Sequence, residues 1–169
     1  VYNLILPTTL GMAAVSCYAI GQVMLPRFHF LPLLLLVIPR PSFVLGFFSG
    51  GSPDFTTVLE KSVQVIPGTG NNYPWYDLLW GIPHPHINAL AIQVFLLLLF
   101  LLLITKWVDF TTPGRRIVMI LTGITAGVLI PVNSWDALVY YPILGGVVLV
   151  LLHRIISADA DHPRIVDLA

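Results

Sequence analysis

The amino-acid sequence predicts an all-α integral membrane protein with about five transmembrane helices and a long ordered loop on the extracytoplasmic side. The first observation behind this prediction is composition. The 169 residues are 57% hydrophobic and only 9% charged, with a mean hydropathy of +0.89, whereas soluble domains usually carry about 25% charged residues. The second is a series of apolar stretches, each near the length of about 20 residues that crosses a bilayer core as a helix.

These stretches organise the chain as a single transmembrane domain over residues 1–169. The clearest is 87–105, in which the run Val94–Ile104 contains no polar side chain. In the next span, Gly123, Ala126 and Gly127 are small enough to allow close helix packing. The predicted spans are 1–20, 28–48, 87–105, 117–132 and 138–156, with an outer loop over 49–86 and a cytoplasmic tail over 157–169.

The distribution of charge predicts the orientation. If 49–86 lies outside, six of the eight basic residues fall in cytoplasmic segments, which satisfies the positive-inside tendency. The amino end is then outside and the carboxyl end inside. The loop before residue 87 and the short turn Asn133–Asp136 lie on the same outer face, so polar groups distant in the sequence can meet there.

Charge and cysteine content exclude several classes. The formal net charge is zero, and no aromatic–basic pattern suggests a nucleic-acid partner. The single Cys17 excludes an internal disulfide and is expected to be a small packing residue. The lipid bilayer is the expected environment.

Two histidines, His84 and His86, flank Pro85 where the outer loop enters the 87–105 span. They could cap the helix and hydrogen-bond loop carbonyls, contact a phosphate or another polar substrate, or bind a divalent metal ion. A metal site would need a further ligand, for which Asp77 or Asp136 is available.

Asn133-Ser134-Trp135-Asp136 joins two apolar spans, and Asp136 is the acid closest to the hydrocarbon. Ionisable groups at that depth are costly and are candidates for function. Asn, Ser and Asp also cap helices, and Trp favours the membrane interface, so a structural role explains the same residues.

Residues 67–72, Pro-Gly-Thr-Gly-Asn-Asn, form a turn-rich run containing Gly68, Thr69 and Asn71. Its backbone N–H groups could bind an anion, although a surface turn is the simpler interpretation. His29 and His153 lie near the ends of apolar runs. Either could ligate a pigment metal, and an interfacial polar role is again the simpler interpretation.

Three motifs in order, VIPGTGNNYP, HPHINAL and NSWD, resemble the "YYY" family of uncharacterised polytopic membrane proteins of bacteria and archaea. The matching residues are Gly68, Thr69, Asn71, Pro74, His84, Pro85, His86, Asn133, Trp135 and Asp136. The chain departs from the family pattern at Asn72, Ile82 and Ala137–Tyr140, and it resembles only the carboxyl-side portion.

That resemblance implies a GT-C glycosyltransferase-like fold, because the family is grouped with these multi-span enzymes. They transfer sugars from lipid-phosphate donors at the outer membrane face. It implies a polyprenyl-phosphate-linked sugar as donor, and location in the cytoplasmic membrane of a bacterium or archaeon. The acidic first outer loop typical of such enzymes is absent from these residues, so either the catalytic part lies outside them or the protein is a non-catalytic relative.

The leading functional hypothesis is therefore a GT-C-like glycosyltransferase, or a relative that binds lipid-linked sugar, acting at the outer face. Asp136 is the candidate catalytic base. The candidate ligand-binding residues are His84, His86, Gly68, Thr69, Asn71, Asn133 and Trp135, with His84 and His86 also candidate metal ligands. The alternative is a non-catalytic transmembrane subunit of a larger complex, one that binds other membrane subunits and for which lipid or pigment is a further candidate ligand.

Overall fold

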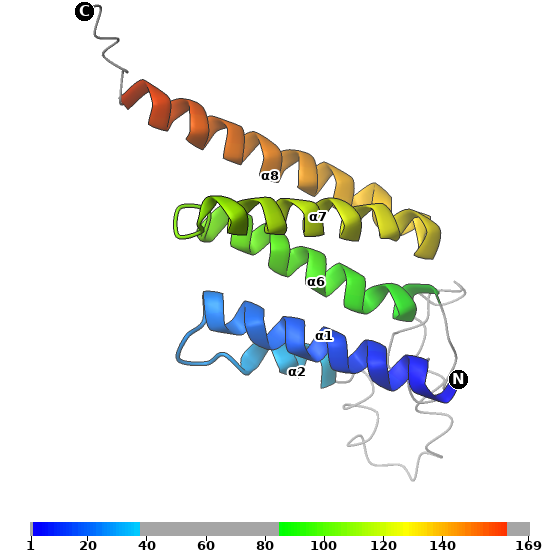
Figure 1. Ribbon diagram of the computed structural model, residues 1–169. Coiled ribbons are helices and arrows are strands. Elements are labelled where there is room, and N and C mark those ends of the chain that lie inside the picture. Colours follow the sequence, from blue (N-terminus) through cyan, green and yellow to red (C-terminus); the bar gives the residue numbers. More distant parts are fainter. Residues whose placement is uncertain (1, 38–84, 162–169) are drawn as a thin grey trace, which may run out of the picture. The chain divides into compact units, whose positions relative to one another are not determined.

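The computed structural model describes residues 2–37 and 85–161, and that part of the chain is helical, with no strand (Figure 1). Four of its helices are long and apolar enough to cross a membrane. The prediction of an all-α integral membrane fold is confirmed at this level. The helices are α1 (Tyr2–Met24), α2 (Leu31–Val37), α6 (Pro85–Thr105), α7 (Thr112–Val132) and α8 (Ser134–Asp161).

The observed helices differ in length from the predicted spans. α1 continues through Pro7 to Met24, and α7 starts five residues before the predicted 117–132 because Thr111 caps it and Pro113 suits a first turn. Of the predicted span 28–48, only α2 belongs to the described helices. The rest of that span and most of the outer loop 49–86 lie outside the described residues.

The chain divides into two compact units, residues 1–95 and 96–169, with the boundary inside α6. In the first unit, α1 packs against α2. The connection between them is closed by short backbone hydrogen bonds, from Leu25 N–H to the Gly21 carbonyl at 2.7 Å and from Phe28 N–H to the Leu25 carbonyl at 2.8 Å. The first bond satisfies one of the last carbonyls of α1, which have no partner within the helix, and the second closes the turn that follows.

Gly21 permits this close return of the chain. A Cβ atom at that position would lie 1.9 Å from the His29 carbonyl oxygen, a distance at which the backbone itself would have to move. The His29 ring is fixed on the other side by an edge-on contact with Tyr18, with ring centroids 5.0 Å apart. The connection between α1 and α2 therefore requires a glycine at position 21.

In the second unit, α7 and α8 form an antiparallel hairpin whose connection is the single residue Asn133 (Figure 1). The buried face of α7 repeats at intervals of three and four residues, as expected for one side of a helix. Within the bilayer its polar groups are satisfied locally, because the Thr122 hydroxyl donates to the Val118 carbonyl at 2.7 Å. The buried residues of α7 are Val118, Thr122, Thr125, Ala126 and Leu129.

Two side chains of α8 bond to carbonyls of preceding helices. The Tyr141 hydroxyl donates to the Ala126 carbonyl of α7 at 3.2 Å, and the Arg154 guanidinium donates to the Ile104 carbonyl at the end of α6. Hydrogen bonds of this kind between helices add to van der Waals packing in a membrane, where lipid tails remove the usual hydrophobic drive for helix association.

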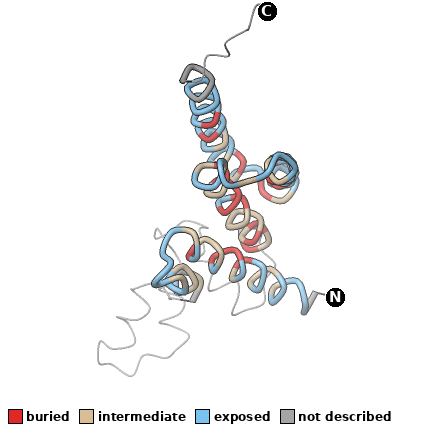
Figure 2. Tube along the Cα trace, turned by 60° about the vertical axis from the view of Figure 1, so that its left-hand side comes forward, coloured by how far each residue is buried: buried red, intermediate tan, exposed pale blue. Residues whose placement is uncertain are grey.

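Most of α7 and α8 is exposed (Figure 2), and many of the exposed side chains are large and apolar. In α8, only 6% of the apolar window is buried, compared with 39% in α6. Large aliphatic side chains such as Leu149 and Ile156 are about two-thirds exposed. An exposed surface of this composition is what a helix presents to lipid.

Candidate functional site

The α7–α8 connection gathers the polar residues of the NSWD motif. Asn133 has extended backbone (φ −157°, ψ 100°) and ends α7, its N–H donating to the Leu129 carbonyl. The chain re-enters a helix at Ser134. Since no loop separates the two helices, the side chains of this turn are held by the helices themselves.

Asn133 and Asp136 are in direct contact. The Asn133 Nδ2 atom donates to the Asp136 Oδ2 atom at 2.7 Å, and the Asp136 N–H donates to the Asn133 carbonyl at 3.2 Å. Asn133 is 8% exposed and the Asp136 side chain is half-buried. The amide therefore fixes the orientation of a carboxylate that still reaches solvent or ligand.

The position of Asp136 in the first turn of α8 also favours its negative charge, because the amino end of a helix carries a partial positive charge. This is the structural role that the sequence left open as the simpler interpretation. It is compatible with a catalytic one, since an oriented carboxylate is what a general base needs.

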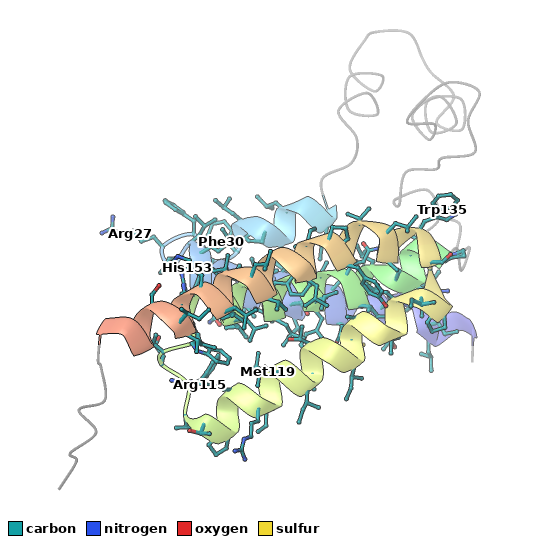
Figure 3. All side chains as sticks on the ribbon, turned by 90° about the horizontal axis from the view of Figure 1, so that it is seen from above. Arg27, Phe30, Arg115, Met119, Trp135 and His153 are labelled. Carbon is teal, nitrogen blue, oxygen red and sulfur yellow. The ribbon has the colours of Figure 1, made fainter. Side chains whose placement is uncertain are left out.

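Two aromatic residues flank the carboxylate. Trp135 is 73% exposed and lies at the end of the hairpin (Figure 3), the position at which tryptophans meet the membrane interface. Tyr140 follows Asp136 by one helical turn, so the two residues share a face of α8. A sugar or headgroup at this turn would meet an aromatic surface beside a carboxylate.

The remaining predicted site residues cannot be placed on this turn. Gly68, Thr69, Asn71 and His84 lie outside the described residues, and of His86 only the backbone, at the start of α6, is described. Among the described residues, no group of three His, Cys, Asp or Glu side chains could hold a metal ion. The metal hypothesis for His84 and His86 stays a prediction.

The two histidines considered for pigment binding differ in their surroundings. The half-buried His29 lies with its Nδ1 atom 3.3 Å from the Pro26 carbonyl. Because a carbonyl can only accept, a hydrogen bond here requires the proton to be on Nδ1. In that tautomer Nε2 keeps its lone pair. The exposed His153 has its Nδ1 atom 3.5 Å from the Ser157 hydroxyl. Neither arrangement alone identifies a ligand.

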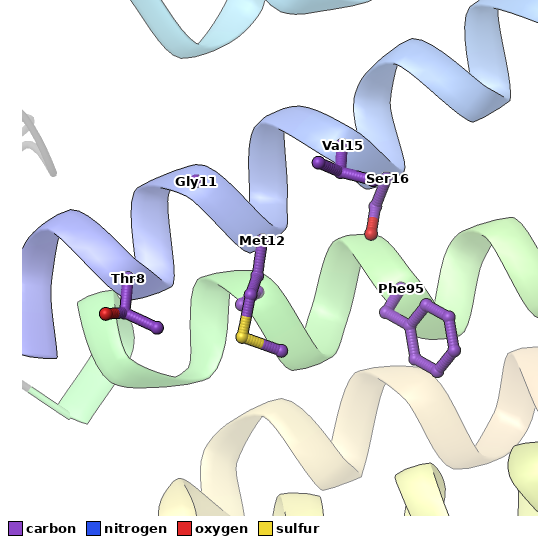
Figure 4. A pocket seen from close by; sticks show the side chains of 7 residues that line it. Thr8, Gly11, Met12, Val15, Ser16 and Phe95 are labelled. Atoms are coloured by element: carbon purple, nitrogen blue, oxygen red, sulfur yellow. The ribbon is translucent and has the colours of Figure 1, made fainter.

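An apolar furrow that was not predicted from the sequence lies within the first unit, with a volume of about 500 Å³ (Figure 4). On α1 its residues recur at intervals of three and four, so they share one helix face. The two α6 residues that complete it belong to the same unit. Small residues at that spacing were the available signal in the sequence. The furrow is lined by Thr8, Gly11, Met12, Val15, Ser16, Ala91 and Phe95.

Comparison with known proteins identifies a family. The family model described as "Uncharacterized membrane protein (DUF2298)" matches residues 1–164. No curated protein and no solved structure matches the chain. The chain therefore belongs to this family of membrane proteins, in agreement with the expectation of an uncharacterised membrane family, whereas the comparison provides no evidence for a relationship to GT-C enzymes.

Proposed function

We propose that this member of the DUF2298 family is a GT-C-like membrane protein that binds a lipid-linked sugar and transfers it at the extracytoplasmic face. The observation that carries the proposal is the Asn133–Asp136 pair, a carboxylate oriented by a buried amide at the joined end of two apolar helices. The resemblance of the three sequence motifs supplies the reaction class.

In this proposal Asp136 is the general base. It accepts the proton of an acceptor hydroxyl as that oxygen attacks the sugar carbon, and the lipid phosphate departs with the bonding electrons. Asn133 keeps the carboxylate facing the acceptor, and Trp135 offers an aromatic surface to the sugar. Charge on the departing phosphate needs compensation. We assign that role to His84 and His86, directly or through a divalent metal ion, with Gly68, Thr69 and Asn71 contributing to the ligand site.

The charge pattern supports the orientation. Within the second unit Arg115 lies toward the end opposite Trp135 (Figure 3). Lys106 follows α6, Arg116 is next to Arg115, and Arg154 bonds to the Ile104 carbonyl at the end of α6, so these basic residues belong to the same end. The positive-inside tendency requires this if the NSWD turn faces outward. We therefore place the amino end outside and the carboxyl end inside, in the cytoplasmic membrane of a bacterium or archaeon.

The furrow of the first unit supports a lipid ligand. Its lining is almost entirely apolar, and a polyprenyl chain requires a hydrocarbon surface of this kind. A donor made only of sugar and nucleotide has no hydrocarbon chain to bind in such a furrow.

Replacement of Asp136 by Asn tests the proposal. The variant keeps the shape of the side chain, and its amide oxygen can still accept from Asn133, so the fold should persist. We expect the transfer of sugar from a polyprenyl-phosphate donor to fall by roughly 10²–10⁴-fold, measured with purified protein in vesicles. The matched control is Asp109→Asn, which removes an exposed carboxylate at the other end of the unit.

Unchanged transfer in the folded Asp136→Asn variant would remove Asp136 as the base. Equal losses in both variants would point to a general effect of charge. Transfer that is undetectable in the wild-type protein would favour the second candidate.

That second candidate is a non-catalytic subunit of a larger membrane complex, and one observation favours it. α8 is almost uncovered, and α7 leaves open space around Gly123 and Gly127, which are spaced four residues apart as in close-packing helix pairs. Native mass spectrometry of the complex extracted from its own membrane would decide. Partners in fixed ratio support the subunit, and their absence contradicts it.

A further inference from the structure

The connection between α6 and α7 carries an uneven distribution of charge. In and next to it are Lys106, Arg115 and Arg116, with Asp109 as the single carboxylate there. Asp159 and Asp161 follow Arg154 by five and seven residues, about 7–10 Å further along α8 at the helical rise. The connection itself is left with a net positive charge.

Two of its cations are already engaged. Lys106 pairs with Asp109 at 3.2 Å. The Arg115 Nε atom donates to the Trp107 carbonyl at 3.0 Å, a terminal nitrogen of the same side chain donates to the Val108 carbonyl at 3.4 Å, and its guanidinium lies 5.2 Å from the Trp107 ring centroid. Arg115 thus orders the connection, although carbonyls and a ring neutralise none of its net charge.

Arg116 is different. Its side chain is exposed, and among the described residues it has no hydrogen-bond or ion-pair partner. It lies in the first turns of α7, where the helix dipole is positive and where an acidic residue would be favourable. α7 has no acidic residue in its first turn. The positive charges of Arg115 and Arg116 and the positive end of the α7 dipole therefore reinforce one another, and no acidic residue in the first turn of α7 offsets them.

The height of this cluster in the membrane identifies the anion. α7 carries no charged residue from Ile117 onward, so Arg116 lies where a spanning helix leaves the hydrocarbon and enters the headgroup layer. The half-buried Trp107 beside Arg115 is typical of the same layer. The anions present there in bulk are lipid headgroups.

We propose that Arg116 and Arg115, at the start of α7, bind the headgroup of an anionic phospholipid. The contact is a charge-assisted one to the phosphate, with the acyl chains running along the apolar surface of the helix. This inference does not depend on the proposed transferase function, because it concerns the opposite end of the unit.

The experiment is native mass spectrometry of the delipidated full chain, titrated with phosphatidylglycerol and with phosphatidylcholine of identical acyl chains. Wild-type protein should prefer phosphatidylglycerol, and the preference should weaken as salt is raised. Arg116→Gln should reduce it about fivefold, the effect expected for one basic residue at an anionic surface. Arg116→Lys should retain most of it.

The matched control is Arg27→Gln, which removes an exposed arginine from the other unit. The inference requires the preference to survive that change, and to survive addition of millimolar inorganic phosphate, since the acyl chains hold the lipid. It is overturned if Arg116→Gln keeps the wild-type preference, if Arg27→Gln loses as much, or if free phosphate displaces the lipid.

Discussion

Two of the helix connections described in this chain, α1–α2 and α7–α8, are built in opposite ways. Between α1 and α2 the backbone returns over six residues and is closed by main-chain hydrogen bonds around Gly21. Between α7 and α8 the chain turns at the single residue Asn133, and side chains hold the turn. The first connection depends on the absence of a side chain, whereas the second depends on polar groups. Only the second places a carboxylate where chemistry could use it.

The largest effect on stability is expected from a substitution that disrupts the α1–α2 connection. In Gly21→Ala the new methyl group would meet the His29 backbone at 1.9 Å, and a backbone cannot move aside as a flexible side chain can. We expect about 3 kcal/mol of destabilisation, at the upper end for overpacking, measured by unfolding in mixed micelles. Gly11→Ala on the same helix is the control. Nothing lies within 4 Å of its Cβ, so it should be close to neutral.

A smaller effect is expected at the second connection. Asn133→Ala removes the donor to the Asp136 carboxylate, and a hydrogen bond to a charged group contributes about 1.5–3 kcal/mol. We expect a loss of about 2 kcal/mol in the same unfolding assay. Ser134→Ala, one residue further and exposed, should change stability by less than about 0.5 kcal/mol. Equal losses in the two variants would contradict the role of the amide.

The smallest effect on stability is expected from a substitution that removes one hydrogen bond of the α7–α8 hairpin and keeps its packing. Tyr141→Phe removes only the hydroxyl that donates to the Ala126 carbonyl. Hydrogen bonds between membrane helices average about 0.6 kcal/mol, and we expect a loss of that size. Tyr140→Phe provides the control on the adjacent residue, for which the structure shows no such bond. If the two variants lose equal stability, Tyr141 acts through its ring alone.

The fold class followed from the sequence because hydropathy alone distinguishes a lipid-facing helix from a soluble one. The proximity of Asn133 and Asp136 could also be predicted from the sequence, since residues three apart at the start of a helix are neighbours. Whether they serve catalysis stays a prediction, as do the roles of Gly68, Thr69, Asn71, His84 and His86.

Other features had no signal at the level of sequence. The bonds of Arg115 and Arg154 end on backbone carbonyls, which every residue carries, so no pattern of residue types indicates the acceptor. Gly21 is one of 13 glycines, and only the three-dimensional return of the chain shows that this one cannot be replaced. Helix α7 begins five residues before the predicted span 117–132, because hydropathy reports the apolar core of a helix and not its polar first turn.

A connection of one residue also limits how the second unit can move. Because Asn133 leaves no slack between α7 and α8, neither helix can rotate about its axis or slide along it without carrying the other or unwinding a turn. A displacement of Asp136 would therefore act on the end of α7 and the start of α8 together, since its carboxylate is bonded to the residue that joins the two helices.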